Sequence, residues 1–287
     1  MKSFFRNLQI KLHVDTFITR LKLQTSLLRR LIPPPSYYCS GTKRTYYSAN
    51  SVWSLDLSDH VQREIAVNSL AFARELTLRL CSSGEDIIDV GANRGNYCIP
   101  MAKKLKGESK VYAFEPNPKS MSDLQHHIRL NNLSPEKLIT LKFGLGRHFY
   151  EVTIKEPAFN SGATTAVVDI PDSKTAAKFP IQIKTLDSFF EEHKVGFIKI
   201  DVEGMDADVL LGGLSTIDNS KPSIYIEVSK ETITDIFRLL ERLGYELYIV
   251  NDDSKKLSRR IDKNIVWGNL LAIMPQKTHL VDDFISN

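Results

Sequence analysis

Two acidic residues accompany a glycine-rich turn in a pattern that could hold a small organic ligand. Residues 86–97 read DIIDVGANRGNY, a short apolar strand followed by a glycine turn and the start of a helix. Glycine lets the backbone approach a ligand closely, and a helix N-terminus favours polar groups. Glu115 lies twenty residues after Gly95, at the end of the next apolar run. A carboxylate there can accept both hydroxyls of a ribose, so the pattern predicts a nucleoside site.

The glycine spacing separates two classes of cofactor. A dinucleotide fold uses G-x-G-x-x-G to fit a pyrophosphate, whereas Gly91 and Gly95 are four residues apart and Asp89 precedes the first by two. Asp89 would repel a pyrophosphate but would attract the ammonium and sulfonium of S-adenosylmethionine, which disfavours an NAD-binding dehydrogenase. The structural alternative is that Asp89 caps the next helix and Glu115 is a solvated strand end.

A second acidic motif follows a later apolar run. The sequence FIKIDVEG places Lys199, Asp201 and Glu203 on one face of a strand, because side chains alternate with period two. A polar face on a central parallel strand must be paired or must line a cleft, here at the strand's carboxyl end beside Asp89. Asp201 and Glu203 are therefore candidate general bases for an alcohol acceptor. The alternative is a buried structural pair of Lys199 with one acid, with Glu203 or Asp206 capping the next helix.

The elements that must position these residues alternate along the chain. The expected strands are 52–57, 87–90, 111–114, 139–143, 195–202 and 224–228, and the expected helices are 59–80, 96–106, 118–131, 206–217 and 231–243. Such alternation predicts an α/β, doubly wound, mostly parallel sheet with helices on both faces. Residues 246–250 and 265–274 are expected to form an antiparallel hairpin at the sheet edge. Strand-type alternation within 147–185 predicts a β insertion beside the site.

Three ordered motifs resemble the FkbM family of class I S-adenosylmethionine-dependent methyltransferases. They are DVGANRG from Asp89, FEPNP from Phe114 and KIDVEG from Lys199, within a similarity that runs from about residue 55 to 273. The resemblance implies a Rossmann-like fold, S-adenosylmethionine as cofactor, and methylation of a hydroxyl on a sugar, lipid-linked saccharide or natural product. The candidate cofactor contacts are Asp89, Gly91, Asn93, Gly95, Glu115 and Asn117.

Several further residues could contribute to the site. Asn160 and Ser161, in the expected insertion, could contact the acceptor or could form a plain turn. Glu227 could join Asp201 in holding a divalent cation. No histidine clusters with the acids, so a site without a metal is expected, and His60 is the histidine within the family-like segment. An N-methyltransferase and a non-catalytic cofactor-binding or scaffold protein stay open as alternatives.

Composition and charge bound the molecule as a whole. The chain has 287 residues, of which 42% are hydrophobic and 25% charged, as in ordinary globular domains. Its three cysteines contain no C-x-x-C pair, so neither a disulfide framework nor a zinc site is expected. No apolar run reaches the roughly 18 residues of a spanning helix, which predicts a cytoplasmic protein.

The basic residues are concentrated at the N-terminus. Residues 1–50 hold nine lysines and arginines against one acid, a net charge of +8, so the remainder is −4 within the total of +4. We expect 1–50 to be a basic amphipathic helical extension and linker, and 51–287 to be the methyltransferase domain, with no nucleic-acid partner. Segment 1–32 could lie peripherally on the inner face of the membrane, or pack on the domain or on a second subunit.

Overall fold

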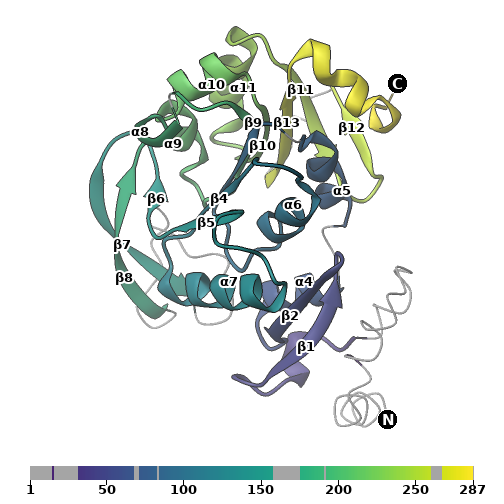
Figure 1. The fold of residues 1–287 in the computed structure, drawn as a ribbon, viewed down its shortest axis with the longest axis vertical. Helices are drawn as coiled ribbons and strands as arrows, with labels where there is room; N and C mark the ends of the chain where they lie inside the picture. Colours follow the sequence, from purple (N-terminus) through teal and green to yellow (C-terminus); the bar gives the residue numbers. More distant parts are fainter. Residues whose placement is uncertain are drawn as a thin grey trace.

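A mostly parallel sheet forms the centre of the computed structural model, which describes residues 15, 32–67, 71–82, 84–157, 175–190, 192–259 and 267–286. The sheet has eight strands in the order β12-β11-β13-β10-β9-β3-β4-β5 (Figure 1). Five neighbouring strands are parallel: β3 (Asp86–Val90), β4 (Val111–Phe114), β5 (Leu138–Leu141), β9 (Val195–Ile200) and β10 (Ser223–Ser229). All residues of β9 are buried, as expected for a parallel strand covered on both faces.

Helices cover both faces of this sheet, which confirms the expected doubly wound class. One face carries α5 (Ala71–Leu80), α6 (Cys98–Lys104) and α7 (Pro118–Leu130), and the other carries α8 (Asp187–Phe190), α9 (Asp206–Leu211), α10 (Leu214–Ser220) and α11 (Ile233–Arg242). The single helix expected over 206–217 is divided at Gly212. A Cβ on that glycine would clash with the carbonyl oxygen of Gly146, so the chain must bend where this close approach occurs.

The C-terminal edge of the sheet is antiparallel, and the two expected strands pair with each other. The strands are β11 (Glu246–Asn251), β12 (Lys256–Ser258) and β13 (Trp267–Ile273). β13 pairs with β11 and also with β10, so it lies inside the sheet, and the short β12 forms the outermost strand. Because residues 270–273 of β13 are fully buried, that strand needs cover on both sides that an edge position would not supply. Two short 3₁₀ helices, Pro275–Leu280 and Asp282–Phe284, follow.

A hairpin precedes the central domain in the chain and packs under it. β1 (Lys43–Ser48) pairs with β2 (Ser51–Asp56), so the strand pair crosses the expected boundary between residues 50 and 51. A 3₁₀ turn at Pro35–Tyr37 comes before it, and α4 (His60–Val67) follows (Figure 1). The side-chain amide of Asn131, the C-cap of α7, bonds both backbone groups of Val52, with distances of 2.9 and 2.7 Å. The hairpin is therefore joined to the domain by a strand-like pair of hydrogen bonds.

The predicted β insertion is confirmed. β6 (Gly144–Leu145), β7 (Tyr150–Pro157) and β8 (Thr175–Lys184) form a separate three-stranded sheet beside the carboxyl ends of the central strands. Its apolar face, with Ile154, Ile181 and Ile183, packs against Met205. Within the described residues, no helix combines the length and apolar character that a bilayer crossing requires.

Candidate functional site

A cavity of about 330 Å³ lies at the carboxyl ends of β3, β4, β9 and β10. The chain runs outward from β3 to β4 and β5 on one side and to β9 and β10 on the other, so the cavity occupies the point where strand order reverses. Residues of α4 and of the β7–β8 sheet complete its walls, including His60 and Ile181. Small-molecule sites of open α/β sheets are found at this position.

The glycine turn after β3 is shaped by packing as well as by access to the cavity. Gly91 has φ +76°, and a Cβ there would clash with the carbonyl oxygen of Asp201. Gly95 has φ +96° and lies against α7, where a Cβ would come within 2.8 Å of Leu124 Cδ1. Asn93, in the left-handed region at φ +48°, lines the cavity together with Gly91. Gly95 is not among the described lining residues, so it supports the turn from behind.

Glu115 is held by two backbone groups at the cavity wall. Its Oε2 accepts a 2.8 Å hydrogen bond from the N–H of Asn93, and its Oε1 accepts one of 2.8 Å from the N–H of Asn117. Burial raises the pKa of this carboxyl to about 7, against the opposing effect of the two N–H groups. Each carboxylate oxygen can accept more than one hydrogen bond, so both can still receive a ligand hydroxyl.

Asn117 acts from behind this carboxyl, because it is not among the described residues that line the cavity. Its side chain accepts from the N–H of Lys119 at 2.9 Å and so caps α7. Its Nδ2 donates to Glu156 Oε2 at 2.7 Å. The residue therefore positions Glu115 and the helix start.

Asp89 is not among the described residues that line the cavity, and its side chain is held by contacts within the fold. Its Oδ2 accepts from the N–H of Cys98 at the start of α6, at 3.1 Å, and its Oδ1 is 3.5 Å from Lys199 Nζ. The side chain is fully buried, and burial raises its pKa while Lys199 opposes the rise. The geometry matches the capping alternative, with Lys199 between Asp89 and the cavity.

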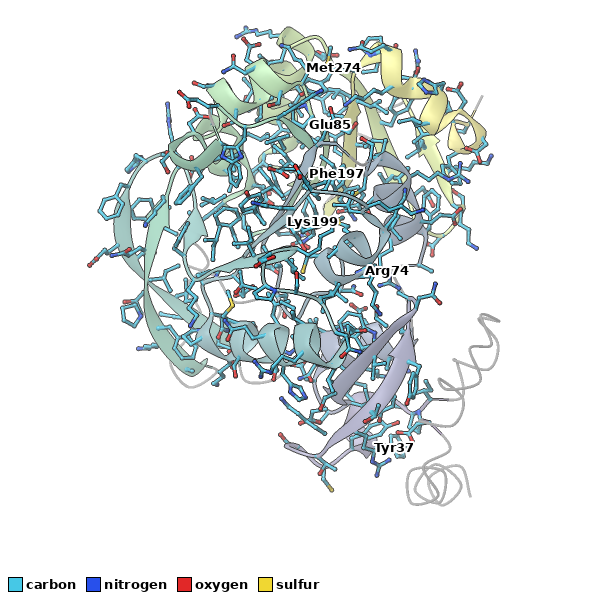
Figure 2. All side chains as sticks on the ribbon, in the orientation of Figure 1. Tyr37, Arg74, Glu85, Phe197, Lys199 and Met274 are labelled. Atoms are coloured by element: carbon cyan, nitrogen blue, oxygen red, sulfur yellow. The ribbon has the colours of Figure 1, made fainter. Side chains whose placement is uncertain are left out.

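Lys199 connects the two acidic motifs at the centre of the molecule (Figure 2). Its Nζ donates to Gly91 O at 3.2 Å and pairs with Asp201 Oδ2 at 3.2 Å. Although burial alone would lower the pKa of Lys199, the carboxylates of Asp201 and Asp89 raise it. This is the buried pair that the sequence offered as the structural alternative, so Asp201 is first a partner of Lys199. The Asp201 side chain is still 41% exposed toward the cavity.

Glu203 has a different environment from Asp201. It lines the cavity from a left-handed backbone position at φ +53°. Burial, together with the charges of Asp201 and Asp206, raises its pKa to about 7, while Lys199 opposes the rise. The turn before α9 is held by Asp206, which accepts from the N–H groups of Val202 and Gly204 at 3.2 and 3.3 Å. Neither candidate caps α9, whose N-cap Met205 makes no side-chain capping bond: Asp206 holds the preceding turn and Glu203 faces the cavity.

Glu227 is a lining residue that the sequence singled out only as a metal partner. Its Oε2 is buried and has no hydrogen-bond partner among the described residues. Burial raises its pKa to about 8, with Asp201 as the largest charge effect. No three His, Cys, Asp or Glu side chains in the described ranges are arranged to hold a metal ion.

Two lining residues were missed although they follow the glycine turn directly. Asn96 accepts a hydrogen bond from buried Arg74, a residue of α5 (Figure 2). Tyr97 lies with its ring centroid 5.1 Å from Lys199 Nζ. Their place just after Gly95 is the signal that could have identified them. Asn160 and Ser161 lie outside the described residues.

The charge of the cavity is strongly asymmetric. Among the described lining residues the carboxyls are Glu64, Glu115, Asp201, Glu203 and Glu227, and Lys199 is the one lysine or arginine. His60 lies at the same wall, with Nδ1 3.9 Å from Glu64 Oε1. A field of this sign favours neutral or cationic ligands over phosphates and carboxylates. A carboxyl with a near-neutral pKa inside it can also accept a proton from a bound hydroxyl.

Comparison with known proteins gives one family. A model of the FkbM methyltransferase domain matches residues 89–247. Methyltransferase 1 of Beauveria bassiana (strain ARSEF 2860) is 27% identical over 192 residues, covering 58% of this chain and 74% of that protein. Residues 89–247, which the family model matches, contain the glycine turn, Glu115, Asp201, Glu203 and Glu227.

Two solved structures are similar at lower identity. Methyltransferase FkbM from Methylobacillus flagellatus KT shares 18% identity with a TM-score of 0.46, covering 86% of this chain and 52% of that one. TYW2 of M. jannaschii, solved in complex with AdoMet, shares 16% identity with a TM-score of 0.45, covering 82% and 87%. The chain thus spans about half the length of the solved FkbM protein.

Proposed function

Because the chain belongs to the FkbM methyltransferase family, we propose that it transfers a methyl group from S-adenosylmethionine to a hydroxyl of a sugar, lipid-linked saccharide or other natural product. The observation that carries the proposal is Glu203, a cavity carboxyl whose pKa burial raises to about 7. A group of that pKa can take the proton of an alcohol near neutral pH.

The residues present fit the cofactor. Both oxygens of Glu115 are oriented by backbone N–H groups and can receive the two hydroxyls of a ribose. The five lining carboxyls against Lys199 suit a ligand with a sulfonium and an ammonium. When bound, S-adenosylmethionine supplies a methyl group already activated for displacement.

The chain's own residues then have three tasks. The walls exclude water and align the acceptor, which can lower a barrier by about 7–11 kcal/mol. Glu203 accepts the hydroxyl proton, a contribution of typically 10²- to 10⁴-fold. Asp201 also lines the cavity, but its Oδ2 is already paired with Lys199 at 3.2 Å.

A nitrogen acceptor is the second candidate. The acidic lining supports it, since a protonated amine would be attracted into the cavity. A general base would still be needed, because an amine attacks only after it loses its proton. A non-catalytic cofactor-binding protein is the candidate of a different class.

The test is methyl transfer itself. Purified protein is incubated with isotopically labelled S-adenosylmethionine and fractionated metabolite extracts, and products are read by mass spectrometry. We expect a labelled methyl ether, whereas a labelled methylamine would favour the nitrogen acceptor. The non-catalytic protein would be supported if the native protein binds the cofactor but labels no more product in any fraction than a boiled control does.

A further inference from the structure

The end of the β10–β13 ladder carries three side chains that the proposed mechanism does not use. The antiparallel register places Glu227 opposite Asn269 and Ser229 opposite Trp267. Residues directly opposite each other project to the same face, and so do residues two apart on one strand. Glu227, Asn269 and Trp267 therefore share one face of the sheet.

That face borders the cavity. Tyr225, two residues before Glu227, is the register partner of Lys199 on β9. Lys199 and Glu227 line the cavity, whereas Asn269 and Trp267 are not among its described lining residues, so the row leads from the cavity wall outward along β13. Diagonal neighbours across such a ladder have their Cβ atoms about 7–8 Å apart, within reach of an aromatic side chain. Trp267 thus stands one diagonal step beyond Glu227.

The three side chains differ in exposure in a way that suits a ring with hydroxyls. Glu227 Oε2 is buried without a partner among the described residues, Asn269 is half-buried, and Trp267 is 53% exposed. A carboxylate and an amide together accept from and donate to hydroxyls. An indole offers a flat apolar surface on which the C–H face of a sugar can pack.

We propose that Glu227, Asn269 and Trp267 form the acceptor subsite, and that its occupant is a neutral pyranose whose ring packs on Trp267. The inference rests on the proposed function and assigns residues and a substrate class to it. A neutral sugar is favoured over an anionic one because Lys199, the one basic lining residue described apart from His60, already pairs with Asp89 and Asp201. The exposed indole gives a sugar ring a contact that a simple amine would not need.

The two tryptophans of the chain permit a direct binding test. Trp53 is fully buried and Trp267 is 53% exposed, so acrylamide should quench mainly Trp267. With S-adenosylhomocysteine present, the protein is titrated with the methyl α-pyranosides of glucose, galactose, mannose and rhamnose. We expect at least one of them to reduce the quenching constant twofold or more. The Trp267→Phe variant, which should lose the quenchable component, verifies the assignment.

Calorimetry with the protecting glycoside then separates contact from stability. We expect Trp267→Ala to weaken glycoside binding about tenfold, Trp267→Phe to restore most of it, and S-adenosylhomocysteine affinity to stay within twofold in both. Phe149→Ala is the control, because Phe149 is an aromatic residue that is 62% exposed and precedes β7, outside the β10–β13 ladder.

Two outcomes would overturn the subsite. The first is that no glycoside reduces the quenching of Trp267 by acrylamide, including the case in which methylamine reduces it and the glycosides do not. The other is that Trp267→Ala binds the glycoside within twofold of wild type. If extracts still accept labelled methyl groups in either case, the subsite fails while the methyltransferase function stands. If no extract accepts label, the function fails independently.

Discussion

At the scale of single residues, the environment of each carboxyl decides its task. Asp89 and Asp201 both face Lys199 and are held in a charge network. Burial raises the pKa values of Glu203 and Glu227 to about 7 and 8, although the charge of Lys199 opposes both rises. Carboxyls with pKa values displaced toward neutrality are the ones suited to proton transfer.

The Glu203→Gln variant tests the proton acceptor. Because only the carboxylate can take a proton, wild-type turnover should rise as pH increases through about 7, the folded pKa of Glu203. The variant should lose at least about 10²-fold in turnover and that rising limb, while S-adenosylhomocysteine affinity is kept. Steady-state rates from pH 5.5 to 9 give the profile. A rising limb that persists in the variant with less than a tenfold loss would exclude Glu203 as the base.

The Glu115→Ala variant tests the ribose contact. Removal of a carboxylate that accepts two ligand hydroxyls should weaken S-adenosylhomocysteine binding by about 1.5–3 kcal/mol, the range for hydrogen bonds to a charged group. Calorimetry measures this loss, and Glu192→Ala, on the surface and outside the described lining, serves as control. Equal affinities of the two variants would contradict the assignment.

At the scale of elements, the turn after β3 depends on its contact with β9. Gly91 lies so close to the carbonyl oxygen of Asp201 that any side chain must separate the two strand ends. The same contact sets the position of Lys199, whose Nζ donates to Gly91 O. Strand spacing and site geometry are therefore coupled through one glycine.

The Gly91→Ala variant tests this coupling against Gly107→Ala. Both glycines have positive φ, +76° and +67°, so in both variants backbone strain should lower the free energy of unfolding by about 1–2 kcal/mol. A Cβ at Gly107 would have no atom within 4 Å, whereas a Cβ at Gly91 would clash with the carbonyl oxygen of Asp201. Gly91→Ala should therefore lower the free energy of unfolding by a further amount of about 2 kcal/mol or above. Urea unfolding gives both free energies. Similar losses in the two variants would show that the turn relaxes freely.

At the scale of the whole molecule, Asp15 joins the N-terminal segment to the β1–β2 hairpin. This residue, the only acid of segment 1–50, is buried and accepts from Tyr46 Oη at 2.8 Å. Arg44 of the same strand is 3.3 Å from its Oδ2. The contact supports packing of at least this point on the hairpin. The rest of the expected amphipathic helical segment, residues 1–14 and 16–31, lies outside the described residues.

We propose that the basic residues near the N-terminus still bring the protein to anionic membrane surfaces. Each lysine or arginine near such a surface contributes about 1 kcal/mol, an attraction that salt screens. The full chain should co-sediment with vesicles containing phosphatidylserine at low salt, and less so at high salt or with neutral vesicles. Replacement of Lys2, Arg6 and Lys11 by glutamine should reduce this binding. A wild-type chain that stays in the supernatant at low salt would sink the proposal.

The sequence by itself determined the faces and ends of the strands. Period-two alternation correctly placed Lys199 on the polar side of β9, and the parallel order brought it to the edge where Glu115 lies. The expected strand over 195–202 ends at Ile200, however, so Glu203 faces the cavity from a turn with left-handed backbone and not from the strand face. Alternation also predicted the β insertion. These features are local, because backbone periodicity and the shared direction of parallel strands suffice to produce them.

Only the tertiary structure decided depth and distant pairing. It placed Asp89 below Lys199, put Glu203 at the cavity wall, and inserted β13 so that Asn269 lies opposite Glu227. Burial depth depends on how layers pack, and a strand's partner depends on which uncovered edge its apolar faces can fill. Neither quantity is encoded in the spacing of residues along one segment, which is why the same acidic motif could be interpreted from sequence as either catalytic or structural.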